Sequence, residues 1–332
     1  MPAKYTHLDP FLSASDADDM LCIAERFGSF GTYADEATSE GLGEELPQRF
    51  DAALNYIESG IDGQGNSEDR DTAIKRTNYF RETYVYGDEI KAPGIEPFMQ
   101  HPEIVGAAGE IAEREIVVPS IIYANLLVPG QELAVHTDVP EFRGANRKVM
   151  PQWLIVVMLH SGLFDEWRIP IVTCVSWFGA AKGGAFTFYP DGVDGKRESI
   201  PAVHNSAILI DTDSVFHGVE RVVREEPDMP EITQQTRLHF LGDDRWQLRN
   251  GDEELENLEW PDLRYSISWK AYCFRDEKEQ KLWQDGSDDL GVDFILDKLE
   301  TELRSRGILD GPKPDPTTFA MLLVKSFVRF PG

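Results

Sequence analysis

The chain has 332 residues, 41% of them hydrophobic and 11% aromatic, a composition typical of a folded protein and not of a disordered one. It carries 32 Lys and Arg residues against 59 Asp and Glu residues, which gives a formal net charge of −27. Because binding to nucleic-acid phosphates and to anionic lipid depends on clustered basic side chains, this balance argues against a nucleic-acid-binding or membrane-docking protein.

The cysteines and the N-terminus indicate the compartment. Cys22, Cys174 and Cys273 are far apart and odd in number, which predicts neither a disulfide framework nor a Cys-x-x-Cys metal site. Free thiols fit a reducing compartment. The N-terminal segment lacks the apolar core of a signal peptide, and no run of residues approaches the ~20 apolar residues of a membrane span. We therefore expect a soluble, cytoplasmic protein.

Residues 1–115 are predicted to form a helical layer. The segment 13–27 begins with Ser and Asp residues that favour a helix N-cap, and its apolar residues follow at helical spacing. A second helix is expected at 46–57, and one or two more at 93–114. Between them, 60–71 is rich in Gly and Asp and is expected to be a loop.

The pattern changes near residue 116, where short runs of β-branched and apolar residues begin. Strands are expected at 116–129, 152–159, 169–178, 185–189, 206–210, 219–223 and 236–241. Several short strands separated by Gly, Pro and Asp turns predict an antiparallel sandwich or jelly roll. The sequence shows no βαβ rhythm, no Gly-x-Gly-x-x-Gly motif and no Walker loop, so a nucleotide-binding α/β fold has little support.

The remaining segment, 243–332, is predicted to be a C-terminal helical extension. Between residues 243 and 300 it contains 17 acidic and 8 basic residues, which indicates a solvated acidic face. Within it, 294–303 has apolar residues near helical spacing and is expected to be an amphipathic helix. We expect one domain in which the helical layer (1–115) and this extension flank a β core at 116–242.

Three residues in the β region have the pattern of a metal site. His136 and Asp138 are two positions apart, and residues i and i+2 of a strand point to the same side. His217 follows 79 residues after Asp138. Two histidines and one carboxylate on one face leave three positions of an octahedral metal open, which is the facial triad of non-haem Fe(II) oxygenases.

The surroundings of these residues strengthen the interpretation. His136 follows an apolar strand and a Pro129-Gly130 turn, and His217 follows an apolar strand and a polar turn. Arg237 lies on the next expected strand. A buried Arg that faces the same cavity needs an anionic partner, and a dicarboxylate supplies one through bidentate pairing.

With these motifs the sequence resembles the Fe(II)/2-oxoglutarate-dependent dioxygenase superfamily over about residues 116–242, somewhat over a third of the chain. The matching stretches are HTD at 136–138, KGGAFTFYP at 182–190, SAILIDTDSVFHGVERV at 206–222 and TRLHF at 236–240. The resemblance implies a mainly β core, a double-stranded β-helix (jelly roll, cupin-like), with N- and C-terminal helical extensions.

The resemblance also implies a chemistry and a set of roles. The triad of His136, Asp138 and His217 would hold Fe(II) as the catalytic centre. Arg237 would bind the distal carboxylate of the cosubstrate 2-oxoglutarate. With O2, the enzyme would hydroxylate a small organic molecule, such as an amino acid or a biosynthetic intermediate, through an Fe(IV)-oxo species and release succinate and CO2. The carboxylate at position 138 argues against a halogenase.

Two more residues, Tyr123 and Asn125, match the polar positions that often contact the cosubstrate in this superfamily; local hydrogen bonds in the core would explain them equally well. Arg237 departs from the family pattern, since it follows the distal histidine by 20 residues instead of about ten. An acidic insertion at 224–235 would account for the difference, and Arg221 and Arg224 are the alternative anchors.

The substrate is less constrained. The loop after Asp138 begins beside the metal, so Glu141, Phe142 and Arg143 are candidates for substrate contact, although the loop equally fits a simple connection. A protein or peptide hydroxylase is the nearest alternative function. A non-catalytic jelly-roll protein that keeps a metal is the alternative from another class. The sequence does not indicate the oligomeric state.

Overall fold

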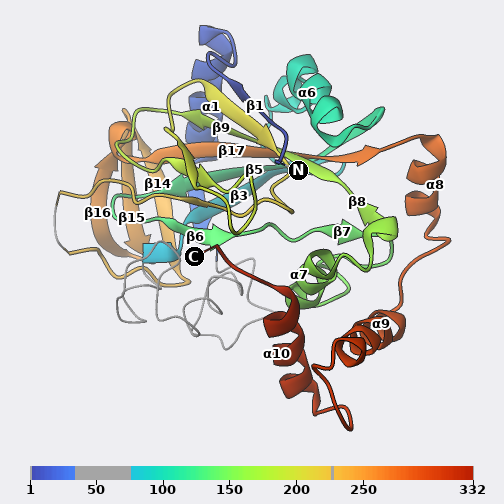
Figure 1. The fold of residues 1–332 in the computed structure, drawn as a ribbon. Helices are drawn as coiled ribbons and strands as arrows, with labels where there is room; N and C mark the ends of the chain where they lie inside the picture. The colour runs from blue at the N-terminus through green and yellow to red at the C-terminus, as the bar shows by residue number, and fades with distance from the viewer. Residues whose placement is uncertain (1, 34–75, 226–227, 332) are drawn as a thin grey trace.

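The computed structural model describes residues 2–33, 76–225 and 228–331 (Figure 1). The helix expected at 46–57 and the loop expected at 60–71 lie outside these residues. None of the described helices combines the length and the apolar character that are needed to cross a bilayer.

Two antiparallel sheets form the core, and a two-stranded ribbon, β7-β8, accompanies them. In chain order the strands are β1 (Tyr5–Leu8), β2 (Ser29–Thr32), β3 (Phe80–Tyr86), β4 (Glu89–Ile90), β5 (Ile116–Leu127), β6 (Leu133–His136), β7 (Glu141–Phe142), β8 (Arg168–Ile169), β9 (Ile171–Phe178), β10 (Phe186–Phe188), β11 (Glu198–Ile200), β12 (Ser206–Ile210), β13 (His217–Val219), β14 (Thr236–Gly242), β15 (Arg245–Asn250), β16 (Glu253–Glu259) and β17 (Arg264–Phe274). The larger sheet has the order β1-β12-β9-β17-β5-β3-β2-β14-β15-β16, with β4 paired to β3, and the smaller sheet has the order β11-β10-β13-β6.

The chain alternates between the two sheets as in a double-stranded β-helix. Strands β12, β9, β17 and β5 are neighbours in the larger sheet, and β11, β10, β13 and β6 make up the smaller one. The chain crosses from β5 to β6, returns to β9, crosses to β10 and β11, returns to β12, crosses to β13 and ends on β17. This path is a jelly roll. The predicted fold class, a jelly-roll core with helical flanks, is confirmed.

Apolar side chains pack the two sheets together. Trp177 on β9 and Ile208 on β12 belong to one buried cluster with Phe186 on β10. Leu127 at the end of β5 packs in a second cluster with Val219 on β13. Because alternate residues of a strand share a face, these contacts fix which side of each strand points into the space between the sheets.

The strand that completes the jelly roll is not the one that the sequence predicts. The predicted last strand, 236–241, is β14, which pairs with β2 and β15 in the outer part of the larger sheet. Strands β14 to β16 form an antiparallel insertion, and β17 then enters between β5 and β9. The core strands therefore continue beyond the expected boundary at residue 242. The assignment of the chain to one domain stays a prediction.

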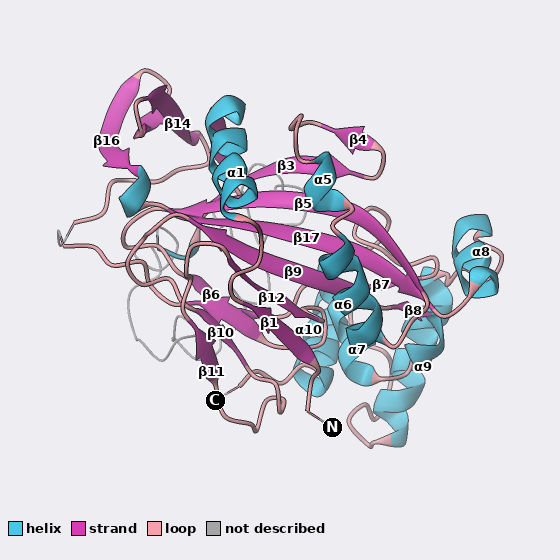
Figure 2. Cartoon of the chain, turned by 90° about the horizontal axis from the view of Figure 1, so that it is seen from above, coloured by secondary structure: helices cyan, strands magenta, loops and turns pink. Residues whose placement is uncertain are grey.

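Helices cover the outer face of the larger sheet (Figure 2). They are α1 (Ala14–Phe27), α5 (Glu96–Met99) and α6 (Pro102–Ala112), and they agree with the helices expected at 13–27 and 93–114. Ser13 caps α1, because its hydroxyl accepts a hydrogen bond from the backbone N–H of Asp16. The N-terminal region also supplies β1 to β4, short strands that the sequence analysis did not predict.

The expected strand at 152–159 is wrong, because these residues form α7 (Gln152–Ser161). Five consecutive apolar residues of this helix, from Leu154 to Met158, are buried. A helix that is buried on all sides has no amphipathic period, so its sequence cannot be distinguished from that of a buried strand.

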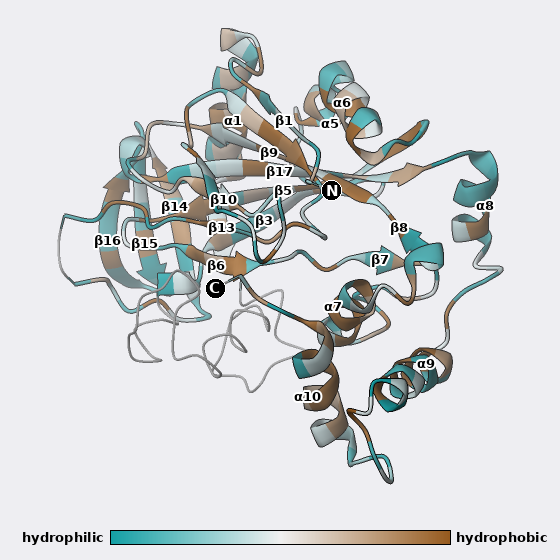
Figure 3. Cartoon of the chain, viewed as in Figure 1, coloured by the Kyte–Doolittle hydropathy of each residue, from teal (hydrophilic) through white to brown (hydrophobic). Residues whose placement is uncertain are grey.

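The C-terminal helices explain this burial. They are α8 (Glu277–Asp285), α9 (Val292–Ser305) and α10 (Pro316–Phe327), and the helix expected at 294–303 is confirmed as part of α9. Apolar side chains of α7, α9 and α10 form one buried cluster, and the brown stretches of the α7 and α10 ribbons in Figure 3 mark their hydrophobic residues. This helical cluster is separate from the buried cluster under the larger sheet.

Candidate metal centre

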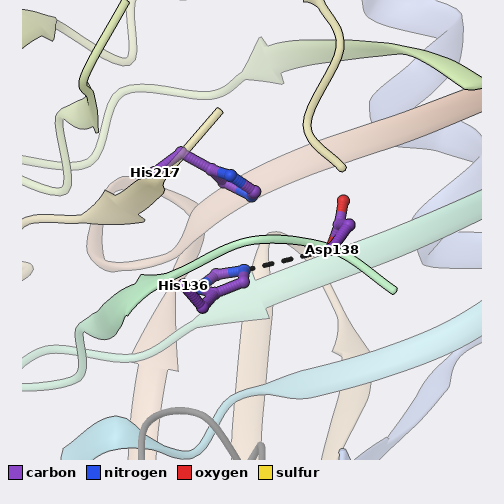
Figure 4. A group of neighbouring side chains, drawn as sticks. All are labelled: His136, Asp138 and His217. Atoms are coloured by element: carbon purple, nitrogen blue, oxygen red, sulfur yellow. Dashed lines mark ion pairs between the residues drawn. The ribbon is translucent and has the colours of Figure 1, made fainter. Parts of the chain in front are cut away.

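The structure brings the three predicted ligands together. His136 is the last residue of β6, and it pairs across the smaller sheet with His217, the first residue of β13. Asp138 follows β6 by two positions. One nitrogen or oxygen ligand atom of each side chain lies within 4.8 Å of the others (Figure 4). We refer to these residues as the triad.

The hydrogen bonds of the two imidazoles prepare them to bind a metal. His136 Nδ1 is 2.6 Å from the carbonyl oxygen of Ala134, and His217 Nδ1 is 2.9 Å from the carbonyl oxygen of Val215. A carbonyl oxygen can only accept a hydrogen bond, so Nδ1 carries a proton in both rings, and in the neutral imidazole Nε2 keeps its lone pair. Nε2 of His136 is 3.9 Å from Oδ1 of Asp138. Such backbone contacts fix the tautomer and the orientation of metal-binding histidines.

Asp138 is held by a residue that the sequence analysis missed. The Nζ of Lys270, on β17, donates to Asp138 Oδ2 at 2.7 Å and to the hydroxyls of Thr173 at 2.9 Å and Thr212 at 3.3 Å. The backbone N–H of Asp138 donates to the carbonyl of Thr212. One carboxylate oxygen therefore turns toward His136 while Lys270 holds the other. No motif in the sequence identifies Lys270, because its role depends on where β17 pairs.

The triad lines a small cavity, about 60 Å³ in volume, which we call the triad cavity; its other polar lining residues are Tyr79, Arg81, Asn125, Thr173, Thr212, Arg264, Ser266, Ser268 and Lys270. Two imidazole nitrogens and one carboxylate oxygen are a donor set that suits Fe(II) and leaves coordination positions for other ligands. The residues present at the site therefore fit the metal that the sequence implies.

Arg264 is the most deeply buried of the three cations that line the triad cavity, which also include Arg81 and Lys270. It is the first residue of β17 and only 3% exposed. Its Nε donates to the carbonyl of Gly184 and its Nη1 to the hydroxyl of Ser266, whereas Nη2 is buried and has no hydrogen-bond partner among the described residues. Burial lowers the pKa of Arg264 to about 9. A buried guanidinium without a carboxylate partner is costly, so the site fits an anionic ligand.

Arg237, the predicted cosubstrate anchor, is not among the residues that line the triad cavity. It lies on β14, where its guanidinium donates to Glu82 Oε1 at 2.8 Å and to the hydroxyl of Ser29 at 2.9 Å. The physical reason is the insertion of β14 to β16, which places the strand after His217 in the outer part of the larger sheet.

The alternative anchors also lie elsewhere. Arg221 pairs with Glu132 at 3.2 Å, and Arg224 pairs with Glu256 at 3.0 Å. Neither lines the triad cavity. No local motif in the sequence marks Arg264, which follows His217 by 47 residues.

Tyr123 and Asn125, the expected cosubstrate contacts, lie near the triad, and their role stays a prediction. Asn125 lines the triad cavity; its Oδ1 accepts from Arg81 Nε at 2.9 Å, and its Nδ2 donates to the hydroxyl of Ser268 at 3.1 Å. The ring of Tyr123 lies 4.4 Å from the guanidinium carbon of Arg81 and lines a neighbouring cavity. Both residues thus have partners inside the protein and also border the space beside the triad.

Of the three candidates in the loop after Asp138, one borders a cavity. Glu141 lines the neighbouring cavity and accepts a hydrogen bond from the Tyr272 hydroxyl at 2.8 Å. Phe142 is buried in the helical cluster of α7, α9 and α10. Arg143 forms an ion pair with Asp288 at 2.9 Å. Phe142 and Arg143 therefore have structural roles.

Comparison with known proteins gives structural similarities alone. No family model and no curated protein matches the chain. A solved Burkholderia pseudomallei oxidoreductase of the 2OG-Fe(II) oxygenase family is similar over 82% of this chain and 87% of its own, with 9% identity and a TM-score of 0.43. A Trichoplax adhaerens prolyl hydroxylase in complex with a hypoxia-inducible-factor peptide is similar over 84% and 86%, with 14% identity and a TM-score of 0.43.

A third similar structure is HygX from Streptomyces hygroscopicus, with nickel, 2-oxoglutarate and hygromycin B bound. It matches over 82% of this chain and 84% of its own, with 7% identity and a TM-score of 0.40. The three descriptions name a 2OG-Fe(II) oxygenase family, a prolyl hydroxylase and a bound 2-oxoglutarate. With identities this low and TM-scores below 0.5, we base the functional proposal on the side chains of the site.

Proposed function

We propose that this protein is an Fe(II)- and 2-oxoglutarate-dependent oxygenase that hydroxylates a small organic molecule. The observation that carries the proposal is the triad cavity itself. It combines two histidines and a carboxylate, all with ligand atoms within 4.8 Å of one another, with a buried guanidinium that lacks an anionic partner among the described residues. Metal and cosubstrate would each meet a complementary group there.

The triad would hold the iron through His136 Nε2, His217 Nε2 and an oxygen of Asp138. Iron bound at these ligands, together with 2-oxoglutarate and O2, supplies the oxidising power for hydroxylation, with release of succinate and CO2. The carbonyls of Ala134 and Val215 keep the imidazole protons on Nδ1, so that both Nε2 atoms stay available. The protein thereby provides a preformed donor set.

Arg264 would bind the distal carboxylate of 2-oxoglutarate, which replaces our sequence-based assignment of Arg237. Its Nε is already fixed by the carbonyl of Gly184, so the guanidinium is oriented before the ligand arrives. The remaining Nη2 is free to donate to a carboxylate oxygen. Ser266, which accepts a hydrogen bond from Nη1, is the second candidate for this contact, because its side chain also lines the triad cavity.

An anaerobic titration tests the proposal. Metal-free protein is titrated with Fe(II) and 2-oxoglutarate while the weak visible charge-transfer band of their chelate is recorded. We expect a band in the wild-type protein and none in His136→Ala or His217→Ala. If neither iron nor 2-oxoglutarate binds, the proposed function is wrong and the jelly roll serves another role.

Two arginine variants test the anchor in the same titration. Arg264→Met should keep iron binding and raise the 2-oxoglutarate concentration at half-saturation at least 100-fold, because the charge-assisted contact to the carboxylate is lost. Arg237→Met is the matched control and should stay within a factor of two of wild type. The opposite pattern would restore Arg237 as the anchor.

A further inference from the structure

A second cavity adjoins the triad cavity, and we call it the outer cavity. Its volume is about 270 Å³, close to the lower end of the range of roughly 300–1,000 Å³ that is typical of small-molecule sites. Arg81, Asp138 and Lys270 line both cavities. A molecule in the outer cavity therefore lies next to the carboxylate of the triad.

The charge of the outer cavity is opposite to that of the chain. Among its described lining residues are four basic side chains, Arg81, Arg147, Lys148 and Lys270, against two acidic ones, Asp138 and Glu141. The whole chain has 32 basic and 59 acidic residues. A cleft of one charge sign concentrates ligands of the opposite sign, and here the rest of the protein repels them. The local excess of positive charge therefore favours the binding of anions in the outer cavity.

Three of the four cations of the outer cavity have interactions with neighbouring side chains. Lys270 donates to Asp138 and Thr173, and Arg81 donates through Nε to Asn125. Lys148 has its Nζ 4.3 Å from the centre of the Tyr86 ring. A ring attracts an ammonium without adding a negative charge beside it, so this contact positions Lys148 at the cavity wall.

Of the two acidic residues of the outer cavity, Asp138 is held by Lys270, and Glu141 accepts hydrogen bonds from aromatic residues of the wall. Glu141 accepts from the hydroxyl of Tyr272 at 2.8 Å and from Nε1 of Trp283 at 3.4 Å. Burial raises the pKa of Glu141. The same contacts place the rings of Tyr272 and Trp283 5.0 Å apart, centre to centre, as part of an aromatic wall. The cavity thus combines flat apolar surface with cationic groups.

We propose that the outer cavity binds the substrate, and that this substrate is a small aromatic or similarly flat molecule with an anionic group, a carboxylate or a phosphate, recognised by Lys148 and its neighbour Arg147. The inference rests on the proposed function, because the bound molecule is a substrate only if the protein is an oxygenase. The preference for anionic molecules can be measured without turnover. It narrows the substrate class from any small organic molecule to an anionic one.

Binding of matched probes to the metal-free protein tests this proposal. The pairs are 3-phenylpropionate with 3-phenylpropionamide, and phenyl phosphate with phenol. The readout is quenching of tryptophan fluorescence, repeated in Trp283→Phe to assign the signal to the cavity. We expect at least one charged probe to bind tenfold or more tightly than its neutral partner, and the stronger pair identifies carboxylate or phosphate. Equal binding within both pairs would overturn the proposal.

A double variant and a matched control locate the anion. Arg147→Met with Lys148→Met changes two exposed residues and should remove the charge preference while leaving neutral-probe binding within a factor of two. Lys196→Met with Arg197→Met removes the same charge from another exposed pair and should leave the preference intact. A preference that survives the first variant, or falls equally in both, would contradict the assignment.

These binding tests distinguish a failure of this inference from a failure of the proposed oxygenase function. Saturating 2-oxoglutarate should leave the charged probe bound, and complete competition would place the probe at Arg264 and overturn the inference. A chelate band with Fe(II) and 2-oxoglutarate but no probe preference would refute only this inference. A probe preference without the chelate band would refute the oxygenase function and leave an anion-binding cavity.

Discussion

At the scale of single residues, the orientation of Arg264 depends on a glycine. Gly184 has φ of +65°, and a Cβ built there would lie 2.4 Å from Arg264 Cδ and 3.0 Å from its Nε. The carbonyl of the same residue accepts from Arg264 Nε. One backbone position therefore both leaves room for the guanidinium and holds it.

We expect Gly184→Ala to raise the 2-oxoglutarate concentration at half-saturation about tenfold, because the added methyl displaces Arg264, while iron binding stays unchanged. The strained backbone should also lower stability by about 1–2 kcal/mol. Gly192→Ala is the control, since Gly192 has φ of +82° but nothing within 4 Å of an added Cβ. Equal effects of both variants on the 2-oxoglutarate titration would show that strain, not the position of Arg264, is responsible.

The triad could be predicted from the sequence because its chemistry leaves a local pattern. His136 and Asp138 lie two apart after an apolar run, and His217 sits in a similar position after another. Arg264 and Lys270 leave no such pattern. Their importance follows from the pairing of β17 between β5 and β9. A motif of fixed spacing cannot predict which strands pair when they lie 80 or more residues apart in the chain.

At the scale of elements, α7 contains a buried histidine. His160, in the last turn of α7, packs against the ring of Phe216 at 5.4 Å between centres. Burial lowers the pKa of His160 to about 4, so the ring is neutral at pH 7. Because the unfolded chain binds this proton more readily than the folded protein, protonation favours unfolding.

We expect the free energy of unfolding to fall as the pH drops from about 6.5, the unfolded value, to about 4, the folded value. His160→Leu should remove a slope of up to about 1.4 kcal/mol per pH unit from this window. Urea denaturation at several pH values measures the difference. Parallel pH profiles of the variant and the wild-type protein would contradict the assignment to His160.

The same scale shows which elements the sequence could predict. Strands β5, β9, β10 and β12 were located within a few residues, because turn residues bound their β-branched runs. The short N-terminal strands escaped, since four residues are too few to establish a period of two. The helix α7 was misassigned because it is apolar on all sides. The order of strands in the sheets required the structure.

At the scale of the whole molecule, the net charge of −27 acts on stability. Like charges repel more strongly in the compact state than in the extended chain, and salt screens the repulsion over a Debye length of about 10 Å at 0.1 M. We expect the thermal midpoint to rise by several degrees between 10 and 200 mM NaCl. Sucrose at matched osmolality is the control for solvent effects. A midpoint that is flat or falls with salt would show that local ion pairs outweigh the net repulsion.

The central position of β17 has a consequence for biosynthesis. Its partners on β5 and β9 are made about 90 to 160 residues earlier. Ser266, for example, lies opposite Asn125 of β5 and opposite Trp177 of β9. Until the ribosome has released residue 274, both neighbouring strands present an open edge, which invites pairing with other chains. The slowest and most aggregation-prone stage of folding should therefore come late in translation, and a nascent chain stalled near residue 242 should need chaperone protection that the full-length chain does not.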